Sequence, residues 1–240
     1  MNPAVKLTNT CKKFGTKTAL DGISFEIPKG KITGYLGPNG AGKTTTLNII
    51  CGVIAMDSGS VSIAGSEIPG DGSYKSRIGY VPENQMMYQQ LTVKEHLVFA
   101  GKLYGIDRGV LKERIDRMLE DFGLQDQKDH PIQKLSKGNK QKTLIACGLI
   151  HEPEILFLDE PLNGLDIESQ FKFKEFLKEY LQKGNTVLYS SHIMEVIERM
   201  TERIIIISKG RIRFDGMIND LVASYGGISF EEAFMKKINE

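Results

Sequence analysis

A glycine-rich segment has the residue types and spacing that bind phosphate groups. Residues 37–44, Gly37, Pro38, Asn39, Gly40, Ala41, Gly42, Lys43 and Thr44, fit the pattern Gly-x4-Gly-Lys-Ser/Thr, and Thr45 follows. Glycines let backbone N–H groups turn toward phosphate oxygens, and the helix expected to begin here adds its positive dipole end. Lys43 would neutralise the β- and γ-phosphates, and the Thr44 hydroxyl would bind Mg²⁺. A glycine-rich turn that only caps a helix is the alternative, but the strand–loop–helix context favours a nucleotide site.

Two adjacent carboxylates suggest the second part of such a site. Four apolar residues, 155–158, precede Asp159 and Glu160, so a strand buried on both faces would deliver the two acids at its C-terminal end. Asp159 would hold Mg²⁺ through water, and Glu160 would act as the general base on the attacking water. Alone, this pattern is more often a strand that meets solvent. The phosphate-binding segment reverses that preference.

The apolar periodicity indicates how the chain positions these residues. The first third has short apolar or alternating runs bounded by turns, which are typical of strands. From Thr92, where Glu95 completes a capping-box pattern, the apolar spacing predicts helices to about Lys134. Strand and helix patterns then alternate, which favours an α/β core with parallel strands. Strands are expected at 5–8, 20–27, 31–36, 59–65, 155–158, 186–190, 203–208 and 211–214, and further helices at 43–51, 173–181 and 193–200.

Composition and charge exclude several classes of protein. The 240 residues include 31 Lys and Arg against 30 Asp and Glu, so a net charge of +1 cannot hold a nucleic acid by bulk attraction. The 40% of hydrophobic and 25% of charged residues are ordinary values for a folded, soluble chain. The longest apolar run, 49–56, is too short to span a membrane, and no secretion signal is predicted. The three cysteines lack metal-ligand spacing and are expected to be small apolar residues in a reducing cytosol.

Three further segments, taken with these motifs, resemble the ATP-binding cassette (ABC) family of transporter nucleotide-binding subunits. Residues 135–139, Leu-Ser-Lys-Gly-Asn, resemble the signature LSGGQ, and residues 162–166, Leu-Asn-Gly-Leu-Asp, resemble the D-loop. His192 follows an apolar strand and is similar to the switch histidine of that family. Plain alternatives exist: His192 as a helix cap or core residue, and Ser136 as a helix N-cap. The resemblance covers about residues 4–220.

The resemblance implies a fold and a domain organisation. The fold would be α/β: a P-loop NTPase core with a mainly parallel sheet and flanking helices, an antiparallel β subdomain and an inserted helical subdomain. Residues 1–240 would form a single ABC ATPase domain, with the helical insertion at about 84–150 and a short C-terminal tail at about 216–240. One or two small helices are expected in this tail, which is too short for the regulatory domain of some importer ATPases.

The resemblance also implies roles for residues outside the phosphate-binding segment. Ser136 and Gly138 would contact the γ-phosphate of an ATP held by a second subunit, so the chain would work only as a pair. His192 would bond the γ-phosphate and orient Glu160 and the water. Lys137 and Asn139 replace a glycine and the glutamine of the signature, but Ser136 and Gly138 are kept, and we expect activity to survive.

Two positions depart from the family's usual residues. Glu83 stands where the Q-loop glutamine is common; it could still ligate Mg²⁺ by oxygen, although it adds a negative charge near the triphosphate. Gln85 could substitute for it if the loop register shifts. Phe14 matches the aromatic that stacks on adenine, where tyrosine is commoner, and a core role is equally compatible with its type.

These features predict an ATP hydrolase with ATP and Mg²⁺ as cofactors. The resemblance implies two partners: a second ABC ATPase subunit, in a homodimer or heterodimer, and a separate transmembrane permease. Three residues after the signature serine, together with Glu83, resemble the subfamily that serves six-helix permeases and often exports its cargo: Lys137, Gln141 and Lys142. The chain would then be cytoplasmic and peripheral on the inner face of the cell membrane, with no nucleic acid expected. The alternatives are a soluble cassette ATPase acting on DNA or the ribosome, and a small-molecule kinase or GTPase.

Overall fold

The computed structural model describes residues 3–68, 70 and 72–240, and a six-stranded sheet lies at its centre. β3, β6, β7, β8 and β9 pair in parallel, and β10 adds one antiparallel edge. Because parallel strands end on the same edge, the loops after β3, β7 and β8 gather there. The order across the sheet is β10(Arg211–Met217), β9(Arg203–Ser208), β3(Ile32–Leu36), β8(Thr186–Ser191), β7(Ile155–Asp159) and β6(Ile78–Val81).

Both faces of the inner strands β3, β7, β8 and β9 are buried, because most of their successive residues are apolar. In β7, Leu156 and Leu158 enter one hydrophobic core, while Ile155 and Phe157 enter the other. The isoleucines of β9 divide between the two cores in the same alternating way. This packing on two sides fixes the end of β7, where Asp159 and then Glu160 emerge.

A second, antiparallel sheet packs with helix α1 (Lys43–Ile50) on the face that contains Ile155 and Phe157. A hairpin turn at Gly15, where φ is +58°, joins its first two strands and pairs Phe14 with Lys17. The end of this hairpin reaches the phosphate-binding segment. The order of the sheet is β2(Lys17–Ile27), β1(Val5–Phe14), β4(Ser58–Ile63) and β5(Ser66–Ile68).

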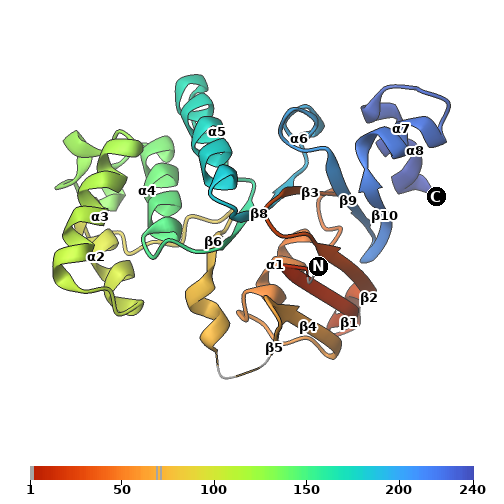
Figure 1. The fold of residues 1–240 in the computed structure, drawn as a ribbon, viewed down its shortest axis with the longest axis horizontal. Helices are drawn as coiled ribbons and strands as arrows, with labels where there is room; N and C mark the ends of the chain where they lie inside the picture. The colour runs from red at the N-terminus through yellow and green to blue at the C-terminus, as the bar shows by residue number, and fades with distance from the viewer. Residues whose placement is uncertain (1–2, 69, 71) are drawn as a thin grey trace.

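Helices α2 (Val93–Leu103), α3 (Arg108–Asp121) and α4 (Lys137–Leu149) lie together beyond the β6 edge of the sheet (Figure 1). α2 begins at the expected capping box, in which Thr92 and Glu95 exchange hydrogen bonds of 3.1 and 2.8 Å. α4 approaches β6 closely, since a Cβ on Gly79 would lie only 2.4 Å from the carbonyl oxygen of Gly148. One face of α3 and its C-cap residue are buried: Leu111, Ile115, Met118, Leu119 and Phe122.

The remaining helices pack into the core on the face of Leu156 and Leu158. They are α5(Ile167–Gln182), α6(Met194–Met200), α7(Ile218–Ser224) and α8(Phe230–Asn239). Short 3₁₀ segments occur at Ser73–Arg77, Gln125–Gln127 and Ile132–Lys134. No helix in the described part of the chain is both long enough and apolar enough to cross a membrane.

The α/β fold with a mainly parallel sheet, an antiparallel sheet and inserted helices is confirmed. Strands β5 and β6 are additions to the elements that the sequence predicted. β5 has three residues and β6 has four, with Gly79 within it, so neither shows a clear apolar period. Helices α2 to α4 fall within the expected insertion, 84–150, and β10 extends two residues into the expected tail. The expected domain bounds include residues 1, 2, 69 and 71, which lie outside the described residues.

Candidate functional site

The phosphate-binding segment forms the loop between β3 and α1, and two of its glycines are required by close contacts. A Cβ on Gly37 would lie 2.3 Å from the backbone oxygen of Ile207. Gly42 has a φ of +118°, and a Cβ there would lie 2.8 Å from a methyl group of Leu20. Gly42 caps α1 without a side-chain hydrogen bond, so the first N–H groups of the helix are left for another acceptor. The loop therefore has the backbone of an anion cradle.

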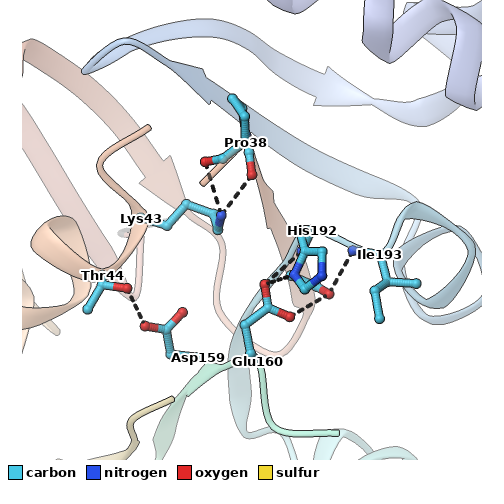
Figure 2. A network of polar contacts seen from close by, with 9 residues as sticks. Pro38, Lys43, Thr44, Asp159, Glu160, His192 and Ile193 are labelled. Atoms are coloured by element: carbon cyan, nitrogen blue, oxygen red, sulfur yellow. Dashed lines mark hydrogen bonds and ion pairs between the residues drawn. The ribbon is translucent and has the colours of Figure 1, made fainter. Parts of the chain in front are cut away.

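Lys43 lies folded over this loop (Figure 2). Its Nζ donates to the carbonyl oxygens of Gly37, at 2.7 Å, and Pro38, at 3.4 Å. Lys43 is only 7% exposed, and burial lowers the pKa of its ammonium group while the carboxylates of Glu160 and Asp159 oppose that shift. The amine of Lys43 thus lies at the phosphate-binding loop, near the carboxylates of Glu160 and Asp159.

Thr44 and Asp159 meet beside the cradle, as Figure 2 shows. The Thr44 hydroxyl donates to Asp159 Oδ2 at 2.7 Å. Asp159 is 1% exposed, and burial raises the pKa of its carboxyl group, although the hydrogen bond from Thr44 lowers it. Glu83, on the loop after β6, lines a cavity that Thr44 and Asp159 also line. A hydroxyl and two carboxylates are oxygen donors of the kind that Mg²⁺ prefers, so the residues present fit this metal.

Glu160 faces the end of β8 and is held there by three hydrogen bonds. Its Oε1 accepts from the His192 N–H, at 2.8 Å, and lies 2.6 Å from His192 Nδ1, while Oε2 accepts from the Ser191 hydroxyl at 3.1 Å. Glu160 is 6% exposed and has a φ of +50°, an uncommon backbone conformation for a residue other than glycine. Ser191 Oγ in turn accepts from the Ile193 N–H, which fixes the loop that carries His192.

Most of these groups line one cavity of about 410 Å³, although Gly37, Ser191 and His192 do not. Phe14 stands at its wall and is 51% exposed, and Lys12 Nζ lies 5.5 Å from the centroid of the Phe14 ring. The half-exposed ring can therefore offer a free surface to a planar base. The cavity is lined by Phe14, Lys17, Ala19, Asn39, Gly40, Gly42, Lys43, Thr44, Thr45, Glu83, Asp159 and Glu160.

Ser136 and Gly138 belong to a different part of the surface. Ser136 is the exposed N-cap of α4 and accepts from the Asn139 N–H at 3.2 Å. Gly138 packs under the loop after β7, where a Cβ on it would lie 2.9 Å from the Gly164 carbonyl oxygen. Neither residue is among those that line the cavity. The structure thus gathers Phe14, most of the phosphate-binding segment, Glu83, Asp159 and Glu160 around one cavity. His192 contacts Glu160 without lining that cavity, and the signature segment lies apart.

Several contacting residues were not predicted from the sequence. Ser191 holds Glu160, and its only sequence signal is its place between a strand and His192. Lys17 and Ala19 line the cavity because the hairpin at Gly15 returns them beside Phe14. Gln85 takes a different position from the one considered for it: its amide bonds to residues of α4, and Glu83 is the residue that faces the cavity.

A family model described as ABC transporter matches residues 20–163, which is more than half of the chain. The chain belongs to the ABC transporter family. This ABC ATPase is 39% identical, over 97% of its length and 75% of the relative, to the linearmycin resistance ATP-binding protein LnrL of Bacillus subtilis. It is 35% identical, over 98% of both chains, to the ABC transporter ATP-binding protein NatA of the same organism. It is 34% identical to the Nod factor export ATP-binding protein I of Paraburkholderia xenovorans, over 96% of its length and 76% of the relative.

Solved structures agree with this assignment. A structure described as the ATP-binding subunit of an ABC transporter superposes with a TM-score of 0.91 at 30% identity and covers 98% of this chain and 99% of that one. A nucleotide-free ATP-binding cassette shares the fold, with a TM-score of 0.79 at 23% identity over 96% of this chain. This ABC ATPase is therefore an ATP-binding subunit of a transporter, and it hydrolyses ATP.

Proposed function

We propose that this ABC ATPase works as one of a pair that closes around two ATP molecules and so drives a separate exporting permease. One observation carries the proposal: Ser136 and Gly138 lie at the exposed start of α4, outside the cavity formed by the phosphate loop of the same chain. The start of a helix with a serine and free N–H groups suits a phosphate. The phosphate that binds there belongs to the ATP held by the second subunit.

Within the cavity, each side chain has a task that its position supports. Lys43 and the first N–H groups of α1 hold the β- and γ-phosphates, and Phe14 stacks on the base. Thr44, Asp159 and Glu83 are the residues that would hold Mg²⁺. When bound, this ion neutralises charge on the phosphate oxygens as the transferred group leaves. Glu83 contributes an oxygen where the family more often has glutamine.

Hydrolysis depends on Glu160. Its carboxylate accepts the proton of a water molecule while the water oxygen bonds to the γ-phosphorus, and the bond from that phosphorus to the β–γ bridging oxygen breaks to leave ADP and phosphate. Ser191 and His192 hold the carboxylate by the three hydrogen bonds described above. His192 is 48% exposed at its side chain, so it remains accessible to the γ-phosphate.

The membrane partner and the direction of transport are inferred from the relatives. LnrL is described as a resistance protein and the Nod factor protein as an export protein, which favours an exporter here. LnrL and NatA are both described as ATP-binding proteins, which favours a cargo path in a separate permease, to which this chain binds on the inner face of the membrane. A gene for a six-helix membrane protein beside this one, and recovery of both chains in one membrane complex, would test that part.

Pairing predicts that the ATPase rate per chain depends on the concentration of the chain. We expect turnover per chain to rise with chain concentration under saturating Mg²⁺ and ATP, because two chains complete each site. Steady-state phosphate release measured across a hundredfold dilution, with light scattering to follow the dimer, tests this. A rate per chain that is constant while the chain stays monomeric would contradict the proposal.

Replacing Glu83 with glutamine should keep or raise ATP hydrolysis. The amide retains an oxygen toward the metal and removes a negative charge from the neighbourhood of the triphosphate. The measurement is kcat together with its dependence on Mg²⁺ concentration, and Glu83→Ala, which removes the oxygen, is the matched control. A collapse of Glu83→Gln to the level of Glu83→Ala would show that the carboxylate charge itself is required.

A further inference from the structure

A fully buried glutamine joins three segments that the proposed reaction uses. Gln141, in the second turn of α4, is 1% exposed. Its Nε2 donates to the carbonyl oxygen of Pro161 at 3.1 Å, and its Oε1 accepts from Gln85 Nε2 at 2.7 Å. The same Gln85 amide reaches the carbonyl oxygen of Lys137 at 3.2 Å.

Each of these contacts lies next to a residue of the proposed reaction. Pro161 directly follows Glu160, and Lys137 directly follows Ser136. Gln85 is on the loop after β6 that carries Glu83. The side chains of Gln141 and Gln85 together therefore link the segments that carry Glu160, Ser136 and Glu83, although neither is among the residues that line the cavity.

Burial makes this connection sensitive to chemical type. A buried amide keeps its place at low cost only while its donor and its acceptor are both paired, and here both are. Removal of the donor would leave the buried Pro161 carbonyl without its partner, which is unfavourable because water cannot replace the lost hydrogen bond there. Packing alone would require only the shape of the side chain. The paired amide also sets the relative position of the segments that it joins.

We propose that Gln141 is a positioning residue for ATP hydrolysis, which holds the Glu160 loop in register with the start of α4. This inference rests on the proposed pairing of two chains, because it gives α4 the task of presenting Ser136 to the second subunit. Gln141 acts through these neighbours and touches no nucleotide. Its loss should therefore lower kcat and leave the affinity of the monomer for ATP unchanged.

The isosteric variant Gln141→Glu tests the hydrogen bond by pH. At pH 8 the introduced carboxylate cannot donate to the Pro161 carbonyl, and we expect kcat per folded chain to fall by about tenfold or more. At pH 6 burial favours the protonated carboxyl, which can again donate to Pro161 and accept from Gln85. The ratio of variant to wild-type kcat should then recover by several fold. Gln141→Met, similar in size but unable to pair, should stay low at both pH values.

Two controls separate positioning from stability. Gln85→Ala removes the hydrogen bonds from Gln85 to Gln141 and to Lys137 but keeps the one from Gln141 to Pro161, and it should lower kcat less than Gln141→Met. Gln182→Leu changes an exposed glutamine at the end of α5 and should leave kcat unchanged. Thermal unfolding of each variant gives the folded fraction to which kcat is referred.

The outcomes distinguish this inference from the pairing on which it rests. Wild-type kcat per folded chain in both Gln141 variants, or loss of fold in both, would overturn the positioning role. A depressed kcat in Gln141→Glu without any recovery at pH 6 would also overturn it. Wild-type turnover that is independent of chain concentration in a monomeric chain would instead overturn the pairing itself, whatever the variants do.

Discussion

Glu160→Gln is expected to lower ATP turnover by roughly 10²- to 10⁴-fold, the usual contribution of a general base. The amide has nearly the same shape as the carboxylate, and its oxygen can still accept from the Ser191 hydroxyl or the His192 N–H. It cannot take the proton of the attacking water. ATP binding should persist, because Lys43, Thr44 and Asp159 are unchanged, so the ATP-bound dimer should accumulate.

Phosphate release measures the loss of turnover, and size-exclusion chromatography with Mg²⁺-ATP measures the accumulation of the ATP-bound dimer. Glu154→Gln is a matched control, since it makes the same exchange just before the opposite end of β7, where Glu154 pairs with Arg77 and is exposed. That variant should hydrolyse ATP at the wild-type rate. Normal turnover by Glu160→Gln would show that another group is the base.

The parts of the site that were predictable are contiguous in sequence. The eight residues 37–44 specify both a loop and its chemistry, because the glycines, the lysine and the start of α1 act within one short segment. The strand before Asp159 was predictable for a similar reason: its unbroken apolar run requires burial on both faces. Thr92 and Glu95 likewise form their capping box within one turn. Each of these patterns is local.

The contacts that were not predictable join distant segments. Ser191 meets Glu160, and Gln141 meets Gln85 and Pro161, only after the order of the strands is set. Periodicity says that a residue is buried but not which polar group it will meet. The left-handed backbone of Glu160, which turns the chain away from β7 immediately after Asp159, has no sequence signal either, since glycine is the usual residue there.

Ser136→Phe should abolish the hydrolysis that depends on pairing, while the monomer keeps its affinity for ATP. Ser136 is exposed and lies outside the cavity of its own chain, so a large ring there meets only what the second chain presents. The substitution also removes the N-cap of α4, at a cost of about 1 kcal/mol. Ser136→Ala shares that loss without the bulk and should retain more activity. Weakened ATP binding by the Ser136→Phe monomer would contradict a site shared between chains.

Mixing the Ser136→Phe and Lys43→Ala variants tests directly whether each site is shared between two chains. Each variant alone lacks a working site, because every site in its dimer has either a defective phosphate loop or a blocked signature. In a mixed dimer, the intact loop of the Ser136→Phe chain faces the intact signature of the Lys43→Ala chain, and the other site carries both defects. Random pairing of equal amounts should therefore restore roughly a quarter of the wild-type sites. A mixture no more active than its separate components would mean that each chain hydrolyses ATP within its own cavity.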